Sequence, residues 1–458
     1  MPIVFDNVTI DGAIIQYDPN IYITFNTIGH ANNTVELRLG NTLFTNATIY
    51  WGDGNSSYYG PNISLSTYTY PSANIYNVII TGTNVSNLET GIVFKGKLQN
   101  VTSLGDIGLR RISFRSENNL QSITNFLPST VQDLSNCFAF LSINNNVFAP
   151  ITLWNTSNVT NMAAMFQSAN AFNQPIGSWD TSNVSNMGSM FANAVTFNQP
   201  IGNWNVNNVT NMNQMFFATT FNQPIGSWDT SKVTNINNMF ANNAQFNQDL
   251  NGWNTANITT AQQTFGNCVS FNSNISNWNT INLSNPTNMF RGASNFNQPI
   301  GNWNTSNFTG CFAMFRQATA FNQPIGNWNM GNVTSLQDMF NQANSFNQNI
   351  DSWNTANVTS MRATFFSAKS FNQPLNSWNT SNANTMFECF SGTDNFNQPL
   401  NNWNTANVAN MGSMFQNALV FNQDLTDWCV TLIPSEPTDF ATGSALTAGN
   451  KPVWGTCP

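Results

Sequence analysis

Residues 296–315 read FNQPIGNWNTSNFTGCFAMF, the first 20 residues of a 25-residue unit that recurs about eleven times along the chain. The tryptophan of the unit marks its register, because successive tryptophans are 25 residues apart except for one step of 24 between Trp204 and Trp228. A period this short cannot enclose a core of its own, but it is long enough for one turn of a coil. The sequence therefore predicts a repeat solenoid. The tryptophan column consists of Trp154, Trp179, Trp204, Trp228, Trp253, Trp278, Trp303, Trp328, Trp353, Trp378, Trp403 and Trp428.

Apolar residues recur at fixed positions of the unit and define its expected core. A Met-Phe pair occupies one position, and a second phenylalanine follows it at another. The pair appears as Met165-Phe166, Met190-Phe191, Met239-Phe240, Met289-Phe290 and Met414-Phe415, and the second column begins with Phe172, Phe197, Phe221 and Phe246. Each coil is expected to bury these side chains against its neighbours, since it has no other core.

Two spacings within the unit suggest its secondary structure. Ile201-x-x-Trp204-x-Val206-x-x-Val209 has the apolar spacing of the strand segment of a leucine-rich repeat. We therefore expect a short parallel strand around Trp-Asn-Thr. The following Val-x-x-Met-x-x-Met-Phe-x-x-Ala places apolar residues three and four apart, which is typical of an α- or 3₁₀-helical turn. Strand and helical turn would lie on opposite walls of the coil.

On these residues the repeats resemble those of BspA-like leucine-rich-repeat surface proteins, in the branch also seen in mycoplasma lipoproteins. The resemblance covers about residues 131–428. It implies a leucine-rich-repeat-like fold. Because the proteins of this family are mostly surface-displayed adhesive or interaction proteins with varied partners, it also implies a binding function without naming the partner.

Polar columns explain why only 7% of the residues are charged. Identical residues in a parallel ladder lie about 4.8 Å apart, so a column of carboxylates would cost about 1 kcal/mol per neighbouring pair, whereas asparagine avoids this repulsion. Alternation puts the residue after tryptophan on the outer face. The asparagine of Phe-Asn-Gln is expected to turn inward and satisfy backbone groups of the turns. The threonine column is also expected to face inward, and consists of Thr156, Thr181, Thr230, Thr255, Thr280, Thr305 and Thr355.

The amino-terminal part of the chain has a different pattern. Residues 1–95 are rich in Thr, Tyr, Ile and Val with alternating stretches, which predicts an all-β domain. Trp51-Gly52-Asp53-Gly54, with the later Tyr68-Thr69-Tyr70-Pro71 segment, resembles a polycystic-kidney-disease (PKD) domain and implies an immunoglobulin-like sandwich, a candidate attachment module. Residues 96–150 are interpreted as irregular leucine-rich capping units. Their apolar positions are Leu104, Leu109, Ile112, Phe114, Leu120, Ile123 and Phe126.

At the other end, the repeats of residues 151–428 are followed by a tail, residues 429–458, that we interpret as a carboxy-terminal cap. An open end of the solenoid would expose strand edge and apolar core, so a cap is needed. Cys429 follows Trp428 in the outward column, and we predict a disulfide with Cys457 that contributes about 3 kcal/mol. The other four cysteines fall on core columns and are expected to be buried thiols: Cys137, Cys268, Cys311 and Cys389.

Several functional classes find little support in the sequence. The single histidine, His30, is not part of a recognisable Ser/His/Asp or Cys/His set. The carboxylates of Asp249, Asp351 and Asp424 fall in different columns of the repeat and do not form a pair. We therefore predict no enzyme activity, no catalytic residues and no cofactor. No C-x-x-C spacing or calcium loop is present, so we predict no metal site. A net charge of −8 with only 12 Lys and Arg argues against nucleic acid as a partner.

The chain begins Met1-Pro2-Ile3-Val4-Phe5-Asp6, without the basic and apolar regions of a secretory signal peptide, and it contains no apolar run of membrane-spanning length. We therefore expect no membrane insertion. The family resemblance implies a location on an extracellular surface or on a virion, and the missing signal leaves three explanations: a signal that this sequence does not include, export without a signal, or transport to the outside on a virus particle assembled in the cytoplasm.

Two hypotheses about function follow from the repeats. In the first, the solenoid is a binding protein that recognises a host-cell glycan or surface protein through many weak contacts. In the second, it is a passive structural component, such as a capsid decoration, spike shaft or fibre, attached to capsid or tail proteins through its amino-terminal domain. A homo-oligomer is considered because viral spikes are often multimeric. Ice binding is a remote alternative, since flat solenoids with threonine ladders can order water. The sequence names no ligand-binding residues.

Overall fold

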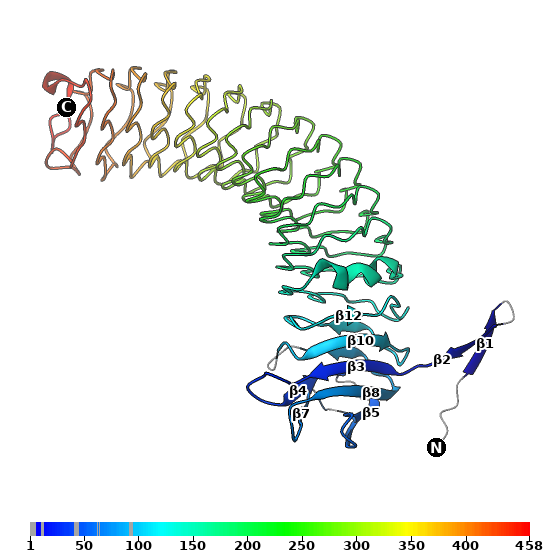
Figure 1. The fold of residues 1–458 in the computed structure, drawn as a ribbon. Coiled ribbons are helices and arrows are strands. Elements are labelled where there is room, and N and C mark those ends of the chain that lie inside the picture. Colours follow the sequence, from blue (N-terminus) through cyan, green and yellow to red (C-terminus); the bar gives the residue numbers. More distant parts are fainter. Residues whose placement is uncertain (1–5, 11–12, 41–44, 62, 64, 91–94) are drawn as a thin grey trace. The chain divides into compact units, whose positions relative to one another are not determined.

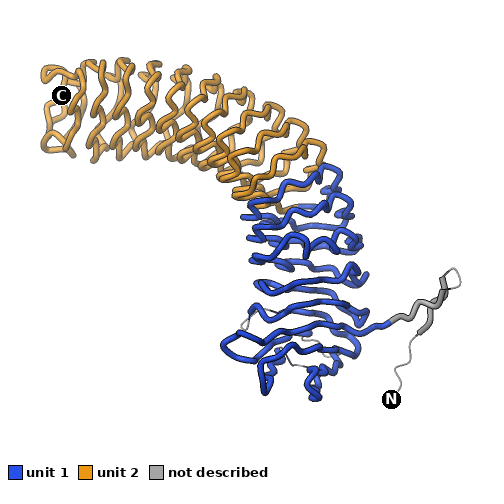
Figure 2. The backbone as a smooth tube through the Cα atoms, viewed as in Figure 1, with its two compact units in different colours: residues 1–209 blue, residues 210–458 orange. Residues whose placement is uncertain are grey.

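The computed structural model describes residues 6–10, 13–40, 45–61, 63, 65–90 and 95–458 (Figure 1). The chain divides into two compact units, unit 1 with residues 1–209 and unit 2 with residues 210–458 (Figure 2). The division falls within the repeats, so each unit contains coils of the same kind. No helix among the described residues is long and apolar enough to cross a membrane.

Unit 1 begins with strands only, as the alternating pattern predicts. A hairpin joins β1 (Asp6–Ile10) to β2 (Ala13–Tyr17). The six-stranded sheet has the order β12-β10-β3-β8-β5-β6, made by β3 (Ile21–Asn26), β5 (Asn46–Tyr50), β6 (Ser56–Tyr59), β8 (Ile75–Thr83), β10 (Leu98–Leu104) and β12 (Ser122–Ile123). Two smaller sheets pair β4 (Thr34–Leu37) with β7 (Ser66–Thr69) and β9 (Asn87–Glu89) with β11 (Arg111–Ser113).

Aromatic rings form the core beneath these strands. Trp51 is fully buried and its ring stacks on Tyr68 at 4.6 Å between centroids. Tyr70 stacks in turn on Tyr76 at 3.6 Å, and its hydroxyl donates to the Trp51 carbonyl. Gly52 has a φ of +84°, and a Cβ there would lie 2.4 Å from the Asn77 carbonyl oxygen. The Gly-Asp-Gly segment therefore makes the tight turn that its sequence predicts.

Residues 96–150 continue the β-domain into the repeats. The strands β10 and β12 pair in parallel, and single parallel bridges then run from Arg111 to Asp133 and from Asp133 to Asn161. The apolar residues predicted for these coils are buried, with one exception. Phe126 is 51% exposed and Leu127 is buried instead. A 3₁₀ helix, η1 (Asn145–Leu153), accommodates the extra residues before Trp154.

The repeating coil has neither the strand nor the helical turn that its apolar spacing suggests. Among the repeats that the structure describes, Trp-Asn-Thr is not a strand, and the Met-Phe segment consists of consecutive turns. In one coil, the amides of Met314, Arg316 and Ala318 each donate to the carbonyl three residues earlier. The third residues of two of these turns, Ala313 and Gln317, have φ angles of 49° and 62°, as in type II turns. The predicted strand and helical turn are therefore wrong in detail.

The inter-coil backbone ladder lies along these turns. Amides that do not close a turn donate to the next coil: Ala313 to the Gln337 carbonyl (3.0 Å), Phe315 to Met339 (3.0 Å) and Gln317 to Asn341 (2.7 Å). Alternate amides thus bond within the coil and between coils, which satisfies the backbone. We call the outward surface of this segment, residues 335–342 and their equivalents, the ladder face. Non-glycine residues at positive φ are costly, and the ladder holds them in place.

On the opposite wall, side chains rather than backbone join the coils. The indole of Trp328 donates to the carbonyl of Ile300, and the hydroxyl of Thr305 donates to the carbonyl of Asn329, both at 3.0 Å. The threonine column is buried, as predicted, with exposed fractions of 0–3%. Because these side chains already bridge the coils, the wall needs no parallel strand at Trp-Asn-Thr. The residue after tryptophan is exposed, also as predicted.

The asparagine of Phe-Asn-Gln does not turn fully inward. Asn198 is exposed and Asn173 is half-buried. The predicted role is nevertheless correct, because the Asn173 carboxamide oxygen accepts the Asn198 amide of the next coil at 3.0 Å. The same bond joins Asn247 to Asn222 in unit 2. The side-chain oxygens of these asparagines therefore satisfy backbone amides of the neighbouring coils at the surface of the turn.

Stacked aromatic columns form the core of unit 2, where its successive coils lie side by side (Figure 1). The phenylalanines of the Met-Phe pairs stack at 5.5–5.8 Å between centroids, and the tryptophans at 6.1–6.5 Å. Both columns are buried, as the sequence predicts.

Two polar side chains, Thr219 and Asn243, form hydrogen bonds in and across the coil that is one residue shorter than the others. This coil lacks one residue in the turn before Phe221, and the Thr219 hydroxyl donates to the Phe216 carbonyl at 3.0 Å, as the Thr393 hydroxyl does to the Phe390 carbonyl in a coil of regular length. Asn243 of the next coil donates to the Phe221 carbonyl at 2.8 Å and to the Thr219 hydroxyl at 3.3 Å. Asn243 is fully buried at a position where many coils have alanine. A buried amide thus satisfies groups that the missing residue would leave unpaired.

A short segment closes the last coil. The structure joins Cys429 and Cys457 in a disulfide. Phe440 is buried, with its ring edge-on to Phe415 at 5.5 Å and to Trp454 at 4.9 Å. The cap includes a short 3₁₀ helix, η2 (Ala448–Asn450). The carbonyl of Asn450 accepts a hydrogen bond from the Leu425 amide of the last coil. The other four cysteines are buried thiols, as predicted.

Candidate binding sites

The polar side chains that the sequence analysis considered for chemistry do not converge. His30 is in the β-domain, where its Nε2 lies 3.2 Å from the Asn119 amide, and burial lowers its pKa. In the part of the chain that the structure describes, no three His, Cys, Asp or Glu side chains are arranged to hold a metal ion. The disulfide between Cys429 and Cys457 belongs to the carboxy-terminal cap. Two polar cavities, one in each unit, are the structural candidates for a binding site.

The first candidate is a cavity of about 360 Å³ on the ladder face of unit 2. We call it the repeat groove. Several consecutive coils contribute to it, because corresponding residues of the turns lie next to one another along the ladder. Its lining combines arginine, carboxylate, amide and aromatic side chains: Phe312, Arg316, Gln337, Asp338, Asn341, Gln342, Arg362, Phe366 and Glu388.

A network of polar side chains, in which some hydrogen-bonding atoms have no partner among the described residues, lies at the centre of the repeat groove. The carboxylate of Asp338 accepts a hydrogen bond from the Asn341 side chain at 2.5 Å, and it lies 3.8 Å from the Arg316 guanidinium. Among the described residues, Arg316 Nε and Asn341 Oδ1 are buried without a hydrogen-bond partner. Buried polar atoms without partners are rare and costly in proteins. The buried atoms themselves are out of reach of a ligand, so a ligand in the groove would contact the accessible atoms of the lining side chains.

Aromatic surface accompanies this network. Phe312 and Phe366 line the groove, and Arg362 lies over the ring of Phe387 with its guanidinium carbon 5.3 Å from the ring centroid. Stacking of this kind fixes the guanidinium plane and leaves its outer N–H groups available. The groove can therefore offer both apolar faces and charged donors to one ligand.

The groove positions differ from coil to coil, whereas the core columns do not. The residue after the Met-Phe phenylalanine is glycine, arginine, asparagine, phenylalanine or serine in successive coils of unit 2: Gly266, Arg291, Arg316, Asn341, Phe366 and Ser391. This position lies outside the stacked aromatic columns and is buried or half-buried, and its residue nevertheless changes from coil to coil. These residues do not follow from the repeat pattern, and the divergence between otherwise similar repeats is the signal in the sequence that points to them.

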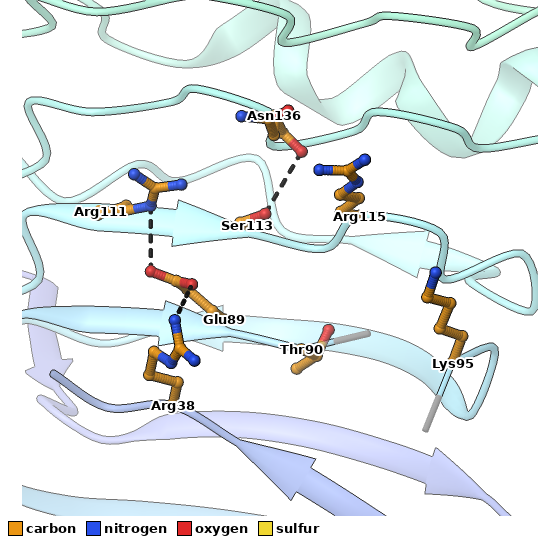
Figure 3. Close-up of a pocket in the computed structure, with 8 residues that line it drawn as sticks. All are labelled: Arg38, Glu89, Thr90, Lys95, Arg111, Ser113, Arg115 and Asn136. Atoms are coloured by element: carbon orange, nitrogen blue, oxygen red, sulfur yellow. Dashed lines mark hydrogen bonds and ion pairs between the residues drawn. The ribbon is translucent and has the colours of Figure 1, made fainter. Parts of the chain in front are cut away.

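The second candidate is a cavity of about 340 Å³ in unit 1 (Figure 3). We call it the arginine pocket. It lies where β9, β11 and the first coil after them run side by side, and its lining is Arg38, Glu89, Thr90, Lys95, Arg111, Ser113, Arg115 and Asn136. Ion pairs join Arg111 to Glu89 at 3.1 Å and to Asp133 at 3.0 Å. Arg38 lies 3.7 Å from Glu89.

A buried carboxyl group near this pocket makes the stability of unit 1 dependent on pH. Glu117 is 1% exposed, and desolvation raises its pKa from 4.5 to about 7, although the Leu98 amide donates to its carboxylate at 3.1 Å. Because the folded-state pKa is raised, its contribution to stability is fully present below about pH 4.5 and is lost as the pH rises through about 7. This loss is expected to reach about 3 kcal/mol at most.

We predict that Glu117→Gln makes the stability of unit 1 less dependent on pH between 5 and 8. The measurement is chemical denaturation of the full chain at a series of pH values. Asp106→Asn, which removes an exposed carboxylate of the same unit, is the control and should retain the slope of the parent protein. An unchanged slope in Glu117→Gln would show that Glu117 is not the titrating group.

Comparison with known families gives one match. Four overlapping segments, residues 109–219, 201–293, 273–369 and 347–448, match a family described as "Mycoplasma protein of unknown function, DUF285". No curated protein and no solved structure shows a significant match to the chain. The matched segments together span residues 109–448, which include the coils of residues 151–428, and this confirms that the chain contains tandem repeats. The chain belongs to this DUF285 repeat family.

Proposed function

We propose that the protein is a non-enzymatic binding protein, displayed on a cell surface or a virion, that recognises a host-cell glycan or surface protein through its ladder face. In this proposal the coils form a leucine-rich-repeat-like solenoid of the BspA-like kind, and residues 1–95 form a PKD-like sandwich that serves for attachment. Membership of a repeat family supports the solenoid. The all-β structure with its Gly-Asp-Gly turn supports the sandwich.

The repeat groove is the observation that carries the binding function. It brings Arg316, Asp338 and Asn341 together with the rings of Phe312 and Phe366 on a face where the repeats diverge. Amide, carboxylate and guanidinium groups can bond the hydroxyl groups of a sugar, while aromatic faces pack on its C–H surface. Support for a ligand comes from this combination of charged, amide and aromatic side chains in one cavity, because an unpaired buried Nε is also found at Arg291, outside the groove.

The test is binding of the labelled full-length protein to a glycan array and to cultured cells. We expect saturable binding at micromolar concentration or below, and a loss of at least about tenfold in affinity for Arg316→Ala, because one desolvated charged anchor often dominates an interface. Arg291→Ala is the matched control: it lies one coil earlier in the same column and does not line the groove. Its affinity should stay within about twofold of the parent protein.

Two results would contradict the proposal. Absence of binding to any glycan or cell at micromolar concentration would remove the binding function. Equal losses in Arg316→Ala and Arg291→Ala would place recognition elsewhere than in the repeat groove.

A passive structural role is the second candidate, and a specific observation favours it. Outside the groove the coils repeat the same contacts with little change, for instance the indole bonds of Trp253, Trp278 and Trp303 to the preceding coil. Such uniformity suits a spacer, such as a spike shaft or capsid decoration. A spacer predicts that Arg316→Ala has no effect on any activity of the assembled particle, which separates the two functions.

A further inference from the structure

The arginine pocket concentrates positive charge in an acidic protein. The chain has 12 Lys and Arg residues and a net charge of −8. Four of those cations, Arg38, Lys95, Arg111 and Arg115, line one cavity of about 340 Å³. Like charges repel, and although Arg38 and Arg111 are placed by ion pairs with Glu89 and Asp133, these pairs do not account for Lys95 and Arg115. Figure 3 shows the four side chains arranged around Glu89 and Ser113.

Rigid backbone positions most of these side chains. Arg111 and Ser113 are the first and last residues of β11, which pairs in parallel with β9 and places Ser113 opposite Glu89. Arg38 forms an antiparallel bridge with Glu89, and Arg111 forms a parallel bridge with Asp133. The pocket is therefore held by strand pairing on two sides. Residues 38 and 111 meet only because the sheet brings them together.

The carboxylates of this region do not balance all of its cations. Glu89 and Asp133 are paired with Arg111 and Arg38 in the ion pairs described above. Among the described residues, no carboxylate pairs with Lys95 or Arg115. The six side chains together carry two positive charges in excess. In addition, Arg38 Nε is buried without a hydrogen-bond partner in the described part of the chain.

Arg115 is exposed, and among the described residues no carboxylate pairs with it. Its guanidinium carbon lies 4.6 Å from the centroid of the Phe140 ring, a cation–π contact. Such a contact leaves N–H groups of the guanidinium able to bond a ligand. A planar fork of donors matches the paired oxygens of a carboxylate, sulfate or phosphate group, whereas the flexible lysine adds a point charge.

We propose that the arginine pocket is a binding site for an oxyanion group, either the acidic group of a sugar or a free inorganic anion, with Arg115 and Lys95 as its principal ligands. The hydroxyl of Ser113 and the amide of Asn136 lie in the lining and complete the set of possible donors. None of the eight lining residues is aromatic, so the pocket offers no stacking surface for a nucleotide base. The site belongs to unit 1 and does not depend on the repeat groove.

The test measures the thermal stability of the full-length protein during titration with sodium sulfate, sodium phosphate and sodium glucuronate, at an ionic strength held constant with sodium chloride. A ligand that binds only the folded protein raises the melting temperature in a saturable manner. We expect such a rise with at least one of these anions. Arg115→Gln and Lys95→Gln, which break no ion pair, should each weaken the apparent affinity at least about fivefold.

Arg110→Gln is the matched control, because Arg110 is an exposed neighbour of Arg111 that does not line the pocket. It should leave the titration unchanged. Tighter binding of glucuronate than of sulfate and phosphate would identify an acidic sugar as the source of the oxyanion group. Tighter binding of sulfate or phosphate than of glucuronate would identify a free inorganic anion. Absence of a saturable rise, or the same weakening in Arg110→Gln as in Arg115→Gln, would overturn the proposal. The glycan-binding test of Arg316→Ala is unaffected by either result.

Discussion

Phe315→Ala is expected to lower the free energy of unfolding of unit 2 by about 3–5 kcal/mol, the cost of removing a fully buried aromatic side chain. The Phe315 ring is fully buried, and it stacks on Phe290 at 5.6 Å, on Phe340 at 5.8 Å and on Phe321 at 4.0 Å. Its removal opens a cavity that touches three coils. The backbone ladder on both sides limits how far these coils can collapse into it, so the cost should lie toward the upper end of the range.

Urea denaturation followed by tryptophan fluorescence measures this effect, because the tryptophan column of unit 2 lies beside the phenylalanine columns. The Phe315 ring is 6.0 Å from Trp328. Phe217→Ala is the control, since Phe217 is a half-buried phenylalanine on the ladder face of the same unit, and its loss should cost less than about 1 kcal/mol. Equal destabilisation by the two substitutions would mean that the stacked columns are not the main source of stability.

Deletion of one complete coil, residues 254–278, is expected to leave a folded protein, whereas deletion of about half a coil, residues 254–265, is expected to abolish cooperative folding of unit 2. Coils contact only their neighbours, so removing a whole coil brings equivalent surfaces together. The indole of Trp303 now donates to the Ile275 carbonyl at 3.2 Å. After the complete deletion it would meet the Leu250 carbonyl, which at present accepts the Trp278 indole at 3.0 Å.

Circular dichroism and thermal unfolding distinguish the two deletions. The protein without residues 254–278 should melt within about 5 °C of the parent protein, with a slightly smaller enthalpy. The half-coil deletion would place turns of the ladder face against the tryptophan wall, and its buried polar groups would lose their partners. Loss of folding on removal of the complete coil would contradict the neighbour-only description of the array. Loss of particle assembly by this folded variant would instead argue against a passive spacer.

The core could be predicted almost completely from the sequence, and the backbone could not. The recurrence of the Met-Phe pair predicts a buried Phe315, because every coil must offer the same apolar residue to the same neighbour. The spacing of Met314 and Phe315 after Cys311 was interpreted as helical. A chain of turns with positive φ at Ala313 and Gln317 produces the same spacing of three and four residues. Apolar periodicity reports which side chains face inward, but it does not distinguish these two backbones.

Irregular positions were predicted least well, for a related reason. The step of 24 residues is visible in the sequence, but the hydrogen bonds from the buried Asn243 to Phe221 and Thr219 across the shortened turn are not. Phe126 was assigned to the core of a capping coil, and the structure buries Leu127 instead. Where the repeat pattern is weak, a shift of one residue changes the side that faces inward.

The sequence by itself determined the length of the coil, the columns that fill its core and the uncharged character of its ladders. It could do so because stacking imposes the same requirement on each repeat, and repetition makes that requirement visible. Only the tertiary structure decided which outward residues gather into sites. Arg38, Lys95, Arg111 and Arg115 have no common spacing, and they surround one pocket because strands far apart in the sequence pair there. Arg316, Asp338 and Asn341 likewise meet because the ladder aligns coils.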